Sequence, residues 1–230
     1  MSWLTGFMPV LFLLIVSASA ALAQPATISG PAKIVDGDTL DVGAVRIRLH
    51  GIDAPEAGQS CKLPNGKTWS CGTAAMNELA ELVDGRTVEC QAHDRDAYGR
   101  IIASCSAAGV DLNRHMVEKG LAWAFLTYSD AFAELEGEIR AAAIGIWQAP
   151  SETPWDYRAN RWARAAEASP RPGCPIKGNV ARGGERIYHT PWSPWYGRTQ
   201  INEAAGERAG SAMKPRRWKQ AGVRRIGANL

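Results

Sequence analysis

Apolar and polar residues alternate along residues 26 to 52, with the period of a half-buried β-strand. Two turn signals, Asp36-Gly37-Asp38 and Val42-Gly43-Ala44, divide this stretch. The pattern therefore predicts three strands, over residues 26–35, 39–42 and 45–52. It also predicts a hairpin between residues 87–92 and 101–107, with its turn at Asp96-Ala97-Tyr98-Gly99.

Helical spacing of apolar residues separates and follows these strands. Residues 73–83 show it most clearly, and Gly85 marks the end of that helix. Shorter helices are predicted over residues 112–119 and 132–143, and an aromatic-rich helix over 154–167. Five strands interleaved with helices favour an α+β fold built on a small closed barrel over a doubly wound parallel sheet.

The N-terminus has the composition of an export signal. An apolar run at residues 9–16 is followed by small residues, which is typical of a secretory signal peptide cleaved after Ala23. The alternative is an uncleaved anchor, but the apolar run is too short to span a bilayer comfortably. We therefore expect residues 1–23 to be removed. The mature protein would be periplasmic or secreted and would not remain inserted in a membrane.

Charge divides the rest of the chain unevenly. Residues 171–230 contain twelve lysines and arginines against three acidic residues, whereas residues 24–170 have a balance of −6. A Pro-rich linker at residues 170–173 separates the two parts. We expect a main barrel domain over 26–150, an aromatic helical extension over 151–169, and a basic C-terminal module or tail over 170–230. The tail is either a polyanion-binding element, a solvated surface or an attachment to an anionic envelope.

Five cysteines suit an oxidising compartment. Cys90 and Cys105 lie symmetrically about the predicted hairpin turn, so the hairpin would place them opposite each other. Cys61 and Cys71 bracket a Pro-Asn-Gly loop that a disulfide could close. Cys174 is then left free. The alternative is five free thiols. A structural zinc site is not expected, since there is no Cys-x-x-Cys pair and the four histidines are scattered.

Three charged motifs carry candidate chemistry. They are Asp36-Gly37-Asp38-Thr39, the stretch from Arg48 to Glu56, and Asp96-Ala97-Tyr98-Gly99-Arg100. Each has an ordinary explanation on its own, because Asp-Gly is a common turn and single arginines are usually solvated. Together they offer carboxylates for a hard cation, arginines for a phosphate and a carboxylate to activate water. That combination favours metal-assisted hydrolysis of a phosphodiester.

In this order and spacing the motifs resemble the thermonuclease, or staphylococcal-nuclease-like, family. The resemblance runs from about residue 32 to 147 and includes Leu112-Asn113, Gly120-Leu121-Ala122 and Gly145-Ile146-Trp147. It implies a five-stranded OB-fold barrel with three helices. It also implies Ca²⁺-dependent cleavage of DNA and RNA that leaves 3′-phosphate ends, with single strands preferred. We expect a monomer.

The resemblance also assigns roles residue by residue. The metal ligands fall on Asp38, Asp53 and the backbone carbonyl of Ala54. The catalytic residues are the two phosphate-binding arginines and the glutamate, which fall on Arg48, Arg100 and Glu56.

Substrate contacts are assigned in the same way. Tyr98 matches a tyrosine that contacts the terminal phosphate. Leu126 occupies the place of a base-stacking tyrosine, for which Phe125 and Tyr128 would substitute. One alternative is a non-catalytic OB-fold protein that only binds single-stranded nucleic acid. In a second alternative, the basic tail, as an envelope-binding or DNA-binding element, has the main function and the nuclease domain is accessory to it.

Overall fold

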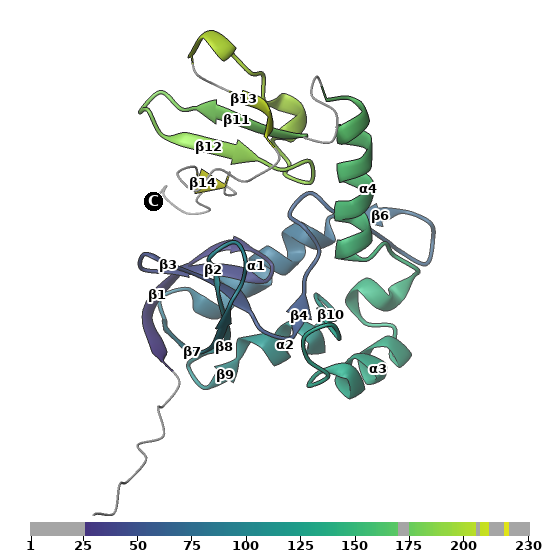
Figure 1. Cartoon of the computed structure of the whole chain (residues 1–230). Coiled ribbons are helices and arrows are strands. Elements are labelled where there is room, and N and C mark those ends of the chain that lie inside the picture. Colours follow the sequence, from purple (N-terminus) through teal and green to yellow (C-terminus); the bar gives the residue numbers. More distant parts are fainter. Residues whose placement is uncertain (1–25, 170–174, 206–207, 212–218, 221–230) are drawn as a thin grey trace, which may run out of the picture.

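The computed structural model describes residues 26–169, 175–205, 208–211 and 219–220 (Figure 1). The predicted signal peptide, the linker and Cys174, which the sequence predicts to be free, lie outside these residues. None of the helices among the described residues is long and apolar enough to span a bilayer.

A sheet closed on itself forms the centre of the molecule. Its strands follow the order β3-β2-β1-β7-β8-β9, and a parallel pairing of β3 with β8 closes five of them into a barrel. The strands are β1 (Thr27–Asp36), β2 (Thr39–Val42), β3 (Val45–Leu49), β7 (Thr87–Arg95), β8 (Ile101–Ala107) and β9 (Val110–Asp111). The predicted α+β fold with a five-stranded barrel is confirmed.

The predicted strand over residues 45–52 is wrong in one respect, because the structure breaks it in two. Strand β3 ends at Leu49, and Gly51 adopts a left-handed φ of 74° that a β-strand does not allow. The chain then forms a second short strand, β4 (Ile52–Asp53), which pairs with β10 (Trp123–Ala124) outside the barrel. The break puts Arg48 on the barrel wall and Asp53 on a separate strand.

Strand β7 is longer than the pattern predicted. A β-bulge between Ala92 and Asp94 disturbs the alternation of apolar and polar residues, yet pairing with β8 continues as far as Arg95. Because β7 is longer, the hairpin turn with Tyr98 and Arg100 lies further from the centre of the sheet.

Helices cover the barrel and add side chains to its core. They are α1 (Cys71–Val83), α2 (Leu112–Glu118), α3 (Ala133–Ala141), the 3₁₀ helix η1 (Gly145–Gln148) and α4 (Pro154–Glu167). Fully buried side chains from the barrel, such as Ile47 and Leu49, join Leu79 of α1 and Met116 of α2 in one apolar cluster. The helices predicted over 73–83, 112–119 and 132–143 are present, with ends that differ by up to two residues.

A buried asparagine attaches α2 to the barrel. The Nδ2 group of Asn113 donates to the carbonyls of His50 (2.9 Å) and Ala103 (3.2 Å), and its Oδ1 accepts from the N–H of Cys105 (3.0 Å). The bonds to His50 and Cys105 give partners to backbone groups at the break in the strand and in the sheet, whereas the carbonyl of Ala103 also accepts from the N–H of His50 (2.8 Å).

The C-terminal segment forms a second, smaller sheet. Its strand order is β13-β11-β12-β14, where the strands are β11 (Ile176–Val180), β12 (Arg186–His189), β13 (Arg208–Ser211) and β14 (Lys219–Gln220). Two short 3₁₀ helices, η2 (Tyr196–Arg198) and η3 (Glu203–Ala205), follow β12. Figure 1 shows α4 running from the barrel to this sheet. The sequence analysis placed no strands here, because the segment has few apolar residues to reveal a period.

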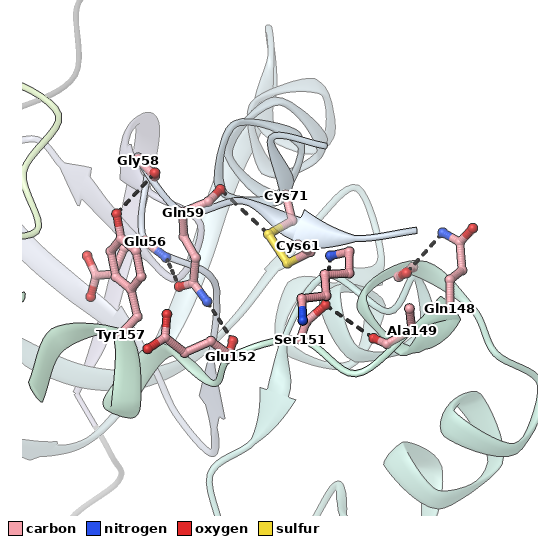
Figure 2. Close-up of a disulfide and its surroundings, with 12 residues drawn as sticks. Glu56, Gly58, Gln59, Cys61, Cys71, Gln148, Ala149, Ser151, Glu152 and Tyr157 are labelled. Carbon is pink, nitrogen blue, oxygen red and sulfur yellow. Dashed lines mark hydrogen bonds between the residues drawn. A yellow bond between two sulfur atoms is a disulfide. The ribbon is translucent and has the colours of Figure 1, made fainter. Parts of the chain in front are cut away.

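Both predicted disulfides are confirmed. Cys90 and Cys105 are direct partners in the β7–β8 register, with Cα atoms 4.1 Å apart. Cys61 and Cys71 are 5.6 Å apart at Cα and tie the small hairpin of β5 (Cys61–Lys62) and β6 (Thr68–Trp69) to the start of α1 (Figure 2). The second disulfide therefore fixes the loop that follows Glu56.

One glycine fixes how closely α1 approaches the Glu56 loop. A Cβ atom at Gly72 would lie 1.8 Å from the carbonyl oxygen of Glu56. We predict that Gly72→Ala lowers the free energy of unfolding by about 1–3 kcal/mol or more, because the backbone must move to relieve the overlap. Gly137→Ala is the matched control, since this exposed position inside α3 has open space around it and should gain about 0.5–1 kcal/mol. Chemical denaturation measures both. A Gly72→Ala protein as stable as the wild type would contradict the close packing.

Candidate active site

The Asp-Gly-Asp-Thr turn places the first acidic side chain of the site. Asp38 follows the turn between β1 and β2, and its Oδ1 accepts a hydrogen bond from the hydroxyl of Thr39 (2.9 Å). A Cβ atom at Gly37 would lie 2.9 Å from the Cβ atoms of both Ala54 and Ala75. Glycine is therefore required here for a steric reason, because the turn lies directly against α1 and against the segment that follows Asp53.

Three carboxylates gather where this turn meets the segment after β4. Asp38 is 5 % exposed, Asp53 0 % and Glu56 9 %. A buried charge is costly unless it is paired and hydrogen-bonded. Arg48 supplies the first compensation: its Nη1 donates to Asp38 Oδ2 at 2.7 Å and its Nη2 to Asp53 Oδ1 at 3.0 Å. The backbone N–H of Ala54 also donates to Asp38 Oδ2 (3.1 Å).

A second arginine, which the sequence analysis did not identify, completes the compensation. Arg158 lies on α4, and its Nη2 donates to Asp53 Oδ2 at 2.7 Å. Its Nη1 donates both to Asp53 Oδ1 (3.1 Å) and to Glu56 Oε1 (2.9 Å). The helix itself was predicted, but its sequence does not show which face would meet the barrel. One signal in the sequence could have indicated the face of the helix that meets the barrel. Trp162 lies one helical turn after Arg158, and an aromatic side chain of this kind often lines a binding pocket.

The surroundings shift the pKa values of the carboxyl groups in different directions. Burial raises the pKa of Asp38, but the charges of Arg48 and Arg100 and two hydrogen bonds outweigh it, so the pKa lies below its ordinary value. Burial raises the pKa of Glu56, and Arg158 offsets only part of this, so the pKa lies above its ordinary value. Asp38 is thus held as an anion, and Glu56 is the better proton acceptor of the two.

The β7–β8 hairpin brings Arg100 to the same place. Asp96 holds the turn: its Oδ1 accepts from the backbone N–H groups of Tyr98 and Arg100, each at 2.9 Å. Its Oδ2 accepts from Nε of Arg100 at 2.6 Å. This bond uses Nε of the guanidinium, and the group lies 5.7 Å from the centre of the Tyr98 ring.

One pocket of about 560 Å³ collects these groups. The predicted residues that line it are Asp38, Arg48, Glu56, Tyr98, Arg100 and Tyr128. Asp53 and Ala54 are buried behind its wall. Leu126 lines a different pocket, next to Trp147, whereas Phe125 borders both.

The extension and the C-terminal module form the other wall of the pocket. Trp162 of α4 and Trp192 of the module both line it, with their ring centres 6.2 Å apart. The backbone of the module also lies close to Gly58, where a Cβ atom would be 3.7 Å from the carbonyl oxygen of Trp192. The pocket is therefore bordered by three parts of the chain: the barrel, α4 and the module.

The donor atoms at the base of the pocket fit a hard divalent cation. Among the described residues, no three acidic, histidine or cysteine side chains form a ready cluster of ligands. The predicted cation site has only two side-chain ligands, because its third ligand is a backbone carbonyl, so a cluster of three such side chains is not required. Each carboxylate has about four lone-pair positions, so Asp38 and Asp53 can keep their arginine bonds and still offer oxygen to a cation.

Comparison with known proteins identifies a family that this chain resembles over most of the barrel domain. The family description "Staphylococcal nuclease homologue" matches residues 46–149, which include Arg48, Asp53, Glu56 and Arg100 but not Arg158. A "Succinoglycan biosynthesis protein ExoI" of Rhizobium meliloti is 34 % identical over 155 residues, which cover 66 % of this chain and 80 % of that protein.

Two nucleases show similar identity over shorter stretches. A "Micrococcal nuclease" of Shigella flexneri is 34 % identical over 144 residues, covering 55 % of this chain and 77 % of that protein. A "Staphylococcal-like nuclease CAN1" of Arabidopsis thaliana is 37 % identical over 120 residues, covering 50 % of this chain but only 34 % of that protein. From the barrel, the arrangement of the site and these matches, the chain belongs to the staphylococcal nuclease family.

Proposed function

We propose that the protein is an exported, Ca²⁺-dependent nuclease that hydrolyses DNA and RNA and leaves 3′-phosphate ends. The observation that carries this proposal is a carboxylate cluster, in which Asp38 and Asp53 meet on Arg48 and Asp53 and Glu56 meet on Arg158, in a pocket that Arg100 also lines. The nuclease relatives, named for the same activity, support it. The roles of the individual residues are part of the proposal.

The cation would be held by Asp38, Asp53 and the backbone carbonyl of Ala54. When bound, it supplies positive charge beside the phosphate that is attacked. All three donors are hard oxygen atoms, which Ca²⁺ prefers and accepts in loose geometry.

The other side chains of the pocket take part in the hydrolysis itself. Glu56 accepts a proton from a water molecule, whose oxygen forms a bond to phosphorus. The bond from phosphorus to the 5′ oxygen breaks, and that oxygen takes a proton from solvent water as it leaves, while Glu56 later returns its proton to solvent. Negative charge grows on the phosphate oxygens in the transition state, where forked hydrogen bonds from Arg48 and Arg100 stabilise it. These two guanidinium groups are positioned before the reaction by Asp38 and Asp96.

Export and the preference for single strands rest on separate features. Two disulfides are typical of proteins from oxidising compartments and support export through the N-terminal signal. Aromatic side chains around the pocket, which include Tyr98, Tyr128 and Trp162, offer flat surfaces on which unpaired bases stack. Such stacking requires bases that are not already stacked in a duplex.

Metal dependence is the first prediction. With two carboxylates as side-chain ligands, the affinity for Ca²⁺ should be weak, with a Kd on the order of 10⁻⁴–10⁻³ M. Cleavage should stop in excess chelator and return when Ca²⁺ is added back, and Asp38→Ala should lose activity. Full activity in chelator would contradict the mechanism.

The forked contacts of Arg48 give the second prediction. Arg48→Lys keeps the charge but loses the fork, so turnover should fall by about 10²–10³-fold. Arg114→Lys is the control, because Arg114 forms an exposed pair with Glu118 on α2 and lies outside the pocket. Steady-state kinetics on a single-stranded oligonucleotide measure both variants. Near-normal turnover of Arg48→Lys would show that Arg48 does not contact the reacting phosphate.

Base stacking on Tyr128 gives the third prediction. Tyr128 is 68 % exposed in the catalytic pocket, while Leu126, two residues away and 63 % exposed, is not part of it. Tyr128→Ala should raise KM for single-stranded DNA by about 5- to 100-fold with little change in kcat, since one stacked base contributes about 1–3 kcal/mol. Leu126→Ala should leave KM unchanged. If the two substitutions changed KM equally, Tyr128 would not be a substrate contact.

A further inference from the structure

Helix α4 is held against the Glu56 loop by a set of specific contacts. Its first turn is capped by Thr153, whose Oγ1 accepts from the N–H of Asp156 (3.3 Å), and Pro154 occupies the first turn. The hydroxyl of Tyr157 donates to the carbonyl of Gly58 (3.1 Å), as Figure 2 shows. The start of the helix and the loop after Glu56 therefore share a direct hydrogen bond.

A buried glutamine joins the same two segments a second time. The Nε2 group of Gln59 donates to the carbonyl of Glu152, just before α4, at 2.7 Å. Its Oε1 accepts from the N–H of Glu56 at 3.2 Å (Figure 2). Gln59 is fully buried, and both ends of its amide are used. The backbone of Glu56 is thus linked to the helix by one side chain.

These contacts fix the base of Arg158, which comes directly after Tyr157. Its guanidinium makes three hydrogen bonds to two carboxylates, Asp53 and Glu56, at 2.7 to 3.1 Å. The opposite charges raise the pKa of the guanidinium, which stays fully charged. By contrast, Arg161 lies over the Tyr157 ring, and Arg164 is exposed near the end of the helix. Arg158 is the arginine of α4 that faces the carboxylates.

We propose that Arg158 is a positioning residue that fixes the carboxylates of Asp53 and Glu56 for hydrolysis, so that α4 is part of the active site. The inference rests on the proposed nuclease function and extends it beyond residues 46–149, which match the family. A rigid, planar fork that spans two carboxylates sets their orientation relative to each other, which a lysine cannot do.

The position of Arg158 has two opposite consequences. Holding Glu56 in place favours the reaction, because a small displacement of a reacting group is costly. The same positive charge lies within hydrogen-bonding distance of Asp53, a proposed cation ligand, and therefore repels a cation bound there. Removing the charge should slow turnover and at the same time strengthen cation binding. General damage to the site would weaken both.

The experiment compares Arg158→Ala, Arg158→Lys and the control Arg164→Ala in the full mature protein. We expect Arg158→Ala to lower kcat by on the order of 10- to 100-fold, with a smaller change in KM. Its Ca²⁺ affinity, measured by titration calorimetry, should rise about threefold or more. Arg158→Lys should recover little of the turnover, whereas millimolar free guanidinium should recover part of it in Arg158→Ala. Arg164→Ala should match the wild type in every measurement.

Each other outcome has a definite meaning. Turnover of Arg158→Ala equal to or above that of the wild type would overturn the inference, since Arg158 would then be neutral or inhibitory. Loss of both turnover and Ca²⁺ affinity would also overturn it, because this is the signature of structural damage. A wild-type protein that binds Ca²⁺ but cleaves no nucleic acid would instead contradict the proposed function. In that case the Ca²⁺ titrations of the variants would still decide whether Arg158 acts on Asp53.

Discussion

Asp53 carries a negative charge with no exposed surface, and its two oxygens are neutralised by Arg48 on one side and Arg158 on the other. Taking an unpaired carboxylate out of water costs several kcal/mol even after relaxation, and each of the two arginines lowers the cost of burying Asp53. Arg48 comes from the barrel and Arg158 from a helix about a hundred residues later in the sequence. The burial of this one group therefore connects the barrel, the segment after β4 and α4.

Several local features of the fold serve this connection. The left-handed turn at Gly51 separates Asp53 from the barrel strand that carries Arg48, which lets the two side chains face each other. Gly72 lets α1 approach the carbonyl of Glu56, and the Cys61–Cys71 disulfide ties the following hairpin to that helix. Gln59 then links this loop to the start of α4. Stability and chemistry thus depend on the same contacts, as is common where charged groups are buried at a functional site.

Local patterns in the sequence were sufficient for most of the barrel, and the resemblance of three charged motifs to one family named residues that the structure brings to one pocket. Alternation gave β2 and β8 with their correct ends, and the symmetry of Cys90 and Cys105 about a turn gave their disulfide. The break at Gly51 was missed although the sequence carries a signal for it, because the apolar positions change phase there, from Val45, Ile47 and Leu49 to Ile52. Arg158 was missed for a different reason: its role depends on how α4 docks, and that is set by Tyr157 and Gln59 through tertiary contacts that no local period records. The sheet of the C-terminal module was missed because its short strands contain few apolar residues.

In the proposed mechanism, the carboxylate of Glu56, held by Arg158 in this pocket, takes the proton from the attacking water. The most direct test is the turnover of Glu56→Gln on a single-stranded oligonucleotide at saturating Ca²⁺. Glutamine has nearly the same shape and keeps an oxygen that can accept the bond from Arg158, but it cannot take up the proton. The account predicts that kcat falls by about 10²–10⁴-fold while Ca²⁺ and substrate still bind. A Glu56→Gln protein that turns over within about twofold of the wild-type rate would contradict it.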